Sequence, residues 1–190
     1  MCRPALKRVL QYLRGTKDLG INFTKGRLTP KGWSDADWGQ CPDTGRSTTG
    51  YLIMLNGAID WSSRLQASVA MSSCESECFA IATSVIETEY LRELLAGIGE
   101  ATELSCTQEN QTIIHVDNQG AIYDAYNRTG RRTRAINIRF HRVREAVNRG
   151  SVQLSKVRGG NSADSEQLAD IFTKAVNRKL FIALRSRFMN

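Results

Sequence analysis

The sequence of 190 residues predicts a single α/β domain, a mixed sheet with helices packed on its faces. Three strand-like segments come first, a long helical pattern follows, and short strands then alternate with helices. The hydrophobic content of 41% is enough to fill one core, which excludes a disordered chain. No apolar run approaches the roughly 20 residues that a membrane span needs.

The first elements are marked by helical spacing and then by turn residues. Leu6, Val9, Leu10 and Leu13 recur at helical spacing, which predicts an amphipathic helix over residues 4–14 that stops at Gly15. Glycine and proline then punctuate a linker, so we divide the chain into a connecting segment, residues 1–30, and a main domain, residues 31–190. Composition and turn chemistry predict three strands in this order: 32–38, 48–56 and 58–62.

A capping box opens the longest predicted helix. It reads Ser72-Ser73-Cys74-Glu75, and we expect the helix to end around Gly97 or Gly99. The elements expected after it are a strand over 112–116, a helix over 118–126, a helix over 136–148, a strand over 151–157, and helices over 165–174 and 178–188.

Cysteine and histidine usage argues against two common classes of small domain. The chain has five cysteines with no C-x-x-C pair and only two histidines, which does not support a disulfide framework or a zinc knuckle. No signal-peptide pattern follows the first residues. We therefore expect a reduced, soluble, intracellular setting.

Basic charge is concentrated in one stretch of the chain. The net charge is +7, and the stretch 128–149 contains eight arginines against the single acid Glu145, while the remainder is neutral. This run can be a solvated face, but its arginine content favours contact with nucleic-acid phosphates. The predicted contacts are Arg128, Arg131, Arg132, Arg134, Arg139 and Arg142.

Four carboxylates lie at the starts or ends of predicted buried elements. Asp35 lies inside a strand, where Asp is disfavoured, and Asp117 follows the strand 112–116 at its carboxyl end. Glu77 lies on the first turns of the long helix, and Asp170 has apolar neighbours. Two carboxylates about 4 Å apart repel by roughly 4 kcal/mol at an effective dielectric of about 20. If the four converge, divalent cations must neutralise them, and two Mg²⁺ or Mn²⁺ ions would form a clamp for displacement at phosphorus.

Each of these acids also has a structural interpretation, because Asp and Glu often cap helices or face water. Glu75 is the rival of Glu77, but its simplest role is in the capping box. Asp37 shares a strand face with Asp35 and could support it. Asp164 and Glu166 fit a helix cap better than a metal site.

The chain resembles the ribonuclease H domain of copia-type LTR retrotransposon polyproteins. The opening residues 6–18 are similar to the end of the reverse transcriptase that precedes this domain. The matching pieces, in family order, are Ser34–Trp38, Asp43–Tyr51, Trp61–Ser63, Ser72–Glu77, Asp117–Gln119, Phe140–His141 and Gln167–Lys174.

The resemblance implies a ribonuclease H-like fold, with five strands in a mixed sheet and helices on both faces. It implies a metal-dependent endonuclease that hydrolyses the RNA strand of RNA/DNA hybrids during reverse transcription, joined to a reverse transcriptase in a polyprotein. The cofactor would be two Mg²⁺ ions, with Mn²⁺ as a substitute. Asp35 would bridge both ions, Glu77 and Asp117 would complete one site, and Asp170 would help to hold the other. The protein would act in the cytoplasm and not at a membrane. The resemblance extends this expectation to a location within virus-like particles.

Ala135 and Asn137, which replace the histidine and aspartate that are commoner in the family, leave an alternative function open. The loop 158–164 also has no histidine, unlike bacterial-type relatives, but copia-type members usually lack it too. The alternative is a catalytically inactive nucleic-acid binding module with the same fold. An integrase-type enzyme ranks lower, because its last acid would be a glutamate and the acid here is Asp170.

Overall fold

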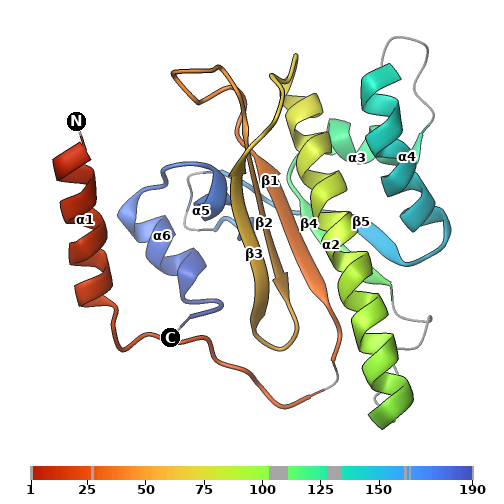
Figure 1. Ribbon diagram of the computed structural model, residues 1–190, viewed down its shortest axis with the longest axis horizontal. Helices are drawn as coiled ribbons and strands as arrows, with labels where there is room; N and C mark the ends of the chain where they lie inside the picture. Colours follow the sequence, from red (N-terminus) through yellow and green to blue (C-terminus); the bar gives the residue numbers. More distant parts are fainter. Residues whose placement is uncertain are drawn as a thin grey trace.

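The sheet of the computed structural model has the strand order β3-β2-β1-β4-β5 (Figure 1). The structure describes residues 2–26, 28–102, 111–127, 134–160, 162 and 164–189. Strands β1, β2 and β3 pair antiparallel, whereas β1–β4 and β4–β5 are parallel, so the sheet is mixed as predicted. The strands are β1 Lys31–Ala36, β2 Thr48–Met54, β3 Ala58–Leu65, β4 Thr112–Val116 and β5 Val152–Lys156.

Helices cover both faces of this sheet (Figure 1). One core is formed by α2, α3 and α4 against β4 and β5, and it includes Ile81, Ile114 and Val143. The other core lies under α5 and α6 and includes Leu52 and Leu180. The helices are α1 Cys2–Gly15, α2 Ser73–Thr102, α3 Gln119–Tyr126, α4 Arg134–Asn148, α5 Asp170–Thr173 and α6 Arg178–Arg185. The predicted fold class is therefore confirmed.

After α1, the N-terminal segment runs past the turn of the β2–β3 hairpin. The backbone N–H of Thr24 donates to the carbonyl of Asn56 at 2.9 Å, which pins the segment to the hairpin turn. Helix α1 meets α6 through the rings of Tyr12 and Phe181, whose centroids are 5.7 Å apart. The division at residue 30 stays a prediction. None of the described helices is long and apolar enough to cross a membrane.

Helix α2 is longer than the sequence predicts. It passes both Gly97 and Gly99 and ends at Thr102, whereas we expected one of these glycines to stop it. Neither glycine has a positive φ, so neither adopts the left-handed conformation that ends many helices.

The helix expected over 165–174 is present only over its last residues, α5. Gln167 is fully buried, and its side-chain amide donates to the carbonyl of Ser34 at 2.9 Å. This bond ties residues before α5 to β1 in a non-helical conformation, so the prediction of a helix cap at Asp164 and Glu166 was wrong.

The last helix, α6, ends at Arg185, whereas the sequence predicts that it continues to residue 188.

Candidate active site

Three of the four predicted carboxylates converge at one end of the sheet. Asp35 lies near the end of β1, Asp117 directly follows β4, and Asp170 is the first residue of α5. Each offers a carboxylate oxygen, and these three atoms lie within 4.8 Å of one another. Asp35 and Asp170 are buried, whereas Asp117 is half-buried. The structure thus assembles residues that are far apart in the sequence into one cluster of oxygen ligands.

Glu77 faces this cluster from α2. Its carboxylate is buried and accepts a hydrogen bond from the backbone N–H of Ala36, which follows Asp35 in β1. Its Oε2 atom is buried with no hydrogen-bond partner among the described residues. An orphaned buried carboxylate oxygen beside three further carboxylates fits a divalent cation such as Mg²⁺, which prefers oxygen ligands.

The protonation equilibria of the cluster reflect burial and mutual repulsion. Burial raises the pKa of Asp35 to about 6, against the opposing effects of Lys174 and Thr173. Burial, and then the charges of Asp35 and Asp117, raise the pKa of Glu77 well above its usual value. Burial also raises the pKa of Asp170. Without a neutralising cation, ionisation of these acids at neutral pH is therefore costly.

Two glycines allow the surrounding backbone to approach the cluster. Gly50 in β2 pairs with Asp35 in β1, and a Cβ there would lie 2.9 Å from Phe172 Cβ. A Cβ at Gly159 would overlap the carboxylate of Asp117. Any larger residue at either position would push α5 or the loop 158–160 away from the carboxylates.

Sequence reasoning missed the role of two residues at the end of α5. The hydroxyl of Thr173 donates to Asp35 Oδ2. Lys174 Nζ lies 2.7 Å from Asp170 Oδ1 and 3.5 Å from Asp35 Oδ2. Lys174 follows Asp170 by four residues, a spacing that places two side chains on one helix face and that the sequence already shows.

The rival acids have structural partners. Asp37 Oδ1 accepts the backbone N–H of Thr48 at 2.9 Å and so holds the loop between β1 and β2. Glu75 Oε2 accepts the backbone N–H of Met71 at 2.7 Å, and Ser72 Oγ accepts the N–H of Glu75, as a helix cap requires. Neither acid belongs to the cluster of three carboxylates.

The predicted arginine contacts fall partly outside the described residues. Arg128, Arg131 and Arg132 lie outside them, and Arg134 begins α4 with a side chain that is not described. Arg139 places its guanidinium 4.0 Å from the centroid of the Phe79 ring. Their contact with nucleic acid stays a prediction.

Arg142 has an ion-pair partner within the protein. Its Nε lies 3.4 Å from Oε2 of Glu89, a buried residue of α2, and Arg149 pairs with the same carboxylate. Both arginine side chains are about half exposed, at 49% and 52%. These contacts fasten α4 to α2 and leave part of each guanidinium facing solvent.

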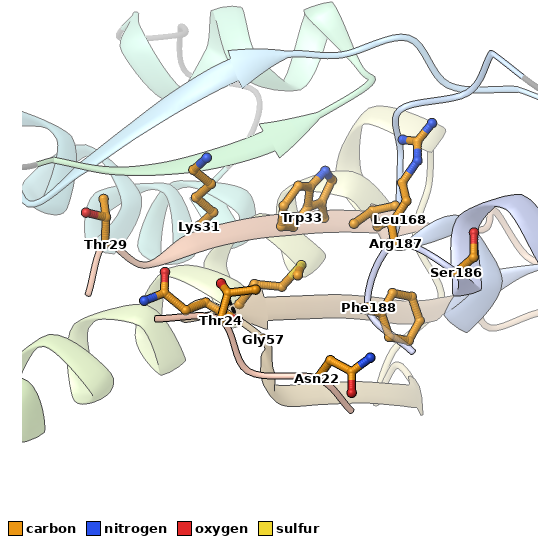
Figure 2. Close-up of a pocket in the computed structure, with 12 residues that line it drawn as sticks. Asn22, Thr24, Thr29, Lys31, Trp33, Gly57, Leu168, Ser186, Arg187 and Phe188 are labelled. Carbon is orange, nitrogen blue, oxygen red and sulfur yellow. Dashed lines mark hydrogen bonds between the residues drawn. The ribbon is translucent and has the colours of Figure 1, made fainter. Parts of the chain in front are cut away.

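A separate hollow lies toward the amino end of β1. It has a volume of about 440 Å³, and Figure 2 shows Lys31 and Trp33 along it, with Leu168 between Trp33 and Arg187 in this view. None of the described residues that line it is an acid, whereas Asp35, Asp117 and Asp170 lie elsewhere.

Comparisons with known proteins identify the relatives of this chain. It is 37% identical over 180 residues to the retrovirus-related Pol polyprotein from transposon RE2 of Arabidopsis thaliana. It is 36% identical over 180 residues to the corresponding protein from transposon RE1 and 34% identical over 179 residues to that from transposon TNT 1-94 of Nicotiana tabacum. Each match covers 93% of this chain. The chain is homologous to one segment of copia-type retrotransposon Pol polyproteins.

This Pol segment has the fold of ribonuclease H. A solved structure of LC11 ribonuclease H1, isolated from compost, superposes with a TM-score of 0.54 at 12% identity. The superposition covers 83% of the Pol segment and 99% of that enzyme. No protein-family profile matches the chain. The Pol segment spans only 12% to 13% of the length of these relatives.

Proposed function

We propose that this Pol segment is a metal-dependent ribonuclease H that hydrolyses the RNA strand of RNA/DNA hybrids during reverse transcription. The observation that carries the proposal is the cluster of Asp35, Asp117 and Asp170 with oxygens within 4.8 Å, in a ribonuclease H fold. Buried carboxylates concentrated in this way favour bound cations, and two such cations can stabilise both the attacking and the leaving oxygen of a phosphodiester.

The residues of the site have distinct proposed roles. Asp35, Asp117 and Asp170 would hold two Mg²⁺ ions together with Glu77, whose Oε2 has no other partner among the described residues. When bound, Mg²⁺ would lower the pKa of a water molecule and would neutralise the negative charge that develops on phosphate oxygens. Thr173 would orient Asp35 through the hydrogen bond that its hydroxyl donates to the carboxylate. Mn²⁺ would substitute, because it prefers the same oxygen ligands.

The wider context belongs to the same proposal. Residues 1–30 would be the end of the preceding reverse transcriptase, to which the domain would be joined in the polyprotein. The arginines of the stretch 128–149 would contact the phosphates of the hybrid, and the domain would choose RNA over DNA through ribose 2′-hydroxyls. It would act in the cytoplasm, within virus-like particles.

A cleavage assay on a labelled RNA/DNA hybrid tests this function. The wild-type protein should cut the RNA strand with Mg²⁺ and lose activity in EDTA. Asp35→Asn and Asp117→Asn should each abolish cutting, while Asp43→Asn, at an exposed turn position, should retain it. Equal cutting by all four proteins would point to a contaminating nuclease. If the protein binds the hybrid equally well with and without Mg²⁺ and does not cleave it, the result favours the inactive binding module.

A further inference from the structure

Lys174 occupies a position that a metal ion would also need. Its ammonium lies 2.7 Å from Asp170 Oδ1 and 3.5 Å from Asp35 Oδ2, so both carboxylates share one cationic partner. These are two of the carboxylates that would hold divalent cations in the proposed function. The amine and a cation that uses the same oxygens are therefore alternatives.

The electrostatics of the cluster explain why a lysine is held there. Asp35 and Asp170 are buried, and among the described residues both carboxylates form ion pairs with Lys174. A single positive charge offsets only part of the negative charge that Asp35, Glu77, Asp117 and Asp170 carry when ionised. A divalent cation would offset more, and it would repel the ammonium at contact distance.

The backbone of Lys174 is anchored while its side chain has room to move. Its N–H donates to the carbonyl of Asp170 at 3.1 Å and closes α5. Its side chain is 27% exposed, and it also lines an open hollow of about 490 Å³ beside the cluster. The polar side chains that line this hollow include those of Asp37, Gln40 and Thr48. The ammonium can thus leave the carboxylates without moving α5.

We propose that Lys174 is a built-in counter-ion that pairs with Asp35 and Asp170 before metal binding and swings into this hollow when divalent cations take the carboxylates. This inference rests on the proposed metal site. Lys174 is then a positioning residue: it keeps the buried acids together in the metal-free protein, and it lowers the affinity for the metal because the ion must displace it.

Titration with Mn²⁺, followed by calorimetry and by the electron paramagnetic resonance signal of free Mn²⁺, tests this competition. Lys174→Met should bind Mn²⁺ about tenfold more tightly than wild type, a difference of about 1.4 kcal/mol. Lys174→Arg, which keeps the charge, should bind no more tightly than wild type. Lys179→Met, which removes an equal charge from an exposed position of α6, should match wild type. Lys174→Gln provides a polar variant should the methionine variant fail to fold.

A second readout follows the side chain itself. Acylation of Lys174 by an amine-reactive ester, measured by peptide mass spectrometry, should become faster when Mn²⁺ is added, while acylation of Lys179 should not change. The inference is overturned if Lys174→Met and Lys174→Gln bind Mn²⁺ no more tightly than wild type does. It is also overturned if the acylation rate of Lys174 does not change when Mn²⁺ is added. Either result leaves the proposed metal site intact. Failure of wild type and all variants to bind Mn²⁺ would overturn the proposed metal site and this inference with it.

Discussion

Gly50 lies opposite Asp35 in the β1–β2 pairing, and a Cβ at Gly50 would lie 2.5 Å from Thr173 Cγ2. The missing side chain lets α5 lie directly on β2. This close approach brings Thr173 to the carboxylate of Asp35 and places Asp170 in the same cluster. A glycine on a neighbouring strand is thus a condition for the proposed metal site.

Gly50→Ala should therefore damage the site through packing. The added methyl must displace Thr173 and Phe172, at a cost of about 1–3 kcal/mol in the free energy of unfolding. We expect weaker Mn²⁺ binding as well, because α5 carries Asp170 and moves away from Asp35. Denaturant unfolding and calorimetric titration measure the two effects.

Gly97→Ala is the matched control for that substitution. Gly97 lies within α2, and an added Cβ would have no heavy atom within 4 Å. Alanine should stabilise the helix there by up to about 1 kcal/mol and leave Mn²⁺ binding unchanged. A Gly50→Ala protein that matches wild type in both stability and Mn²⁺ affinity would contradict the role given to Gly50.

The stability of the metal-free protein should fall as pH rises from about 4 to about 6. The pKa of Asp35 is raised from 3.8 to about 6, so the folded state binds the proton more tightly than the unfolded state. This contribution is fully present below pH 3.8 and is lost as pH rises through the folded pKa. For Asp35 alone the loss is about 3 kcal/mol.

Urea unfolding in EDTA across this pH range measures that loss. Asp35→Asn removes the titrating group, so its unfolding free energy should fall less steeply than that of wild type. Mg²⁺ should restore stability to wild type at neutral pH and have a smaller effect on the variant. If the metal-free stability of the wild-type protein instead rises steadily over the same range, the pKa of Asp35 is not raised by burial.

Glu89→Gln tests whether Arg142 in α4 and Arg149, which directly follows α4, also support the fold. Glu89 is buried and pairs with Arg142 and Arg149, which are half exposed and therefore partly screened by solvent. The substitution should cost about 1–2 kcal/mol in unfolding free energy. Glu93→Gln, at an exposed position of the same helix, should cost less than half of that. If the two variants are equally stable, the ion pairs of Glu89 do not hold α2 and α4 together.

The arginine run should determine the salt dependence of hybrid binding. Replacing Arg131, Arg132 and Arg134 together with alanine should flatten the log-log salt dependence by about one unit for each lost phosphate contact. The affinity should fall similarly for hybrids of different sequence. Fluorescence anisotropy of a labelled hybrid across a salt series measures both, and an unchanged slope would assign these arginines to solvent.

Local patterns were enough to predict much of the fold and to single out the three carboxylates that the structure brings together. The strand 112–116 and the capping box at Ser72 appear where their residues predict them, because both depend on nearby sequence. The helix expected over 165–174 failed because a long-range bond from Gln167 to β1 overrides its local preference. The space left by Gly50 and the partner of Arg142 likewise depend on contacts between distant segments, which a single sequence does not show.

Anomalous diffraction from crystals grown with Mn²⁺ tests most directly whether the acids form a paired metal site. We predict two neighbouring anomalous peaks among Asp35, Glu77, Asp117 and Asp170, with Lys174 turned away from Asp170. Crystals with no such peaks, in which Lys174 still pairs with Asp35 and Asp170 at saturating Mn²⁺, would contradict it.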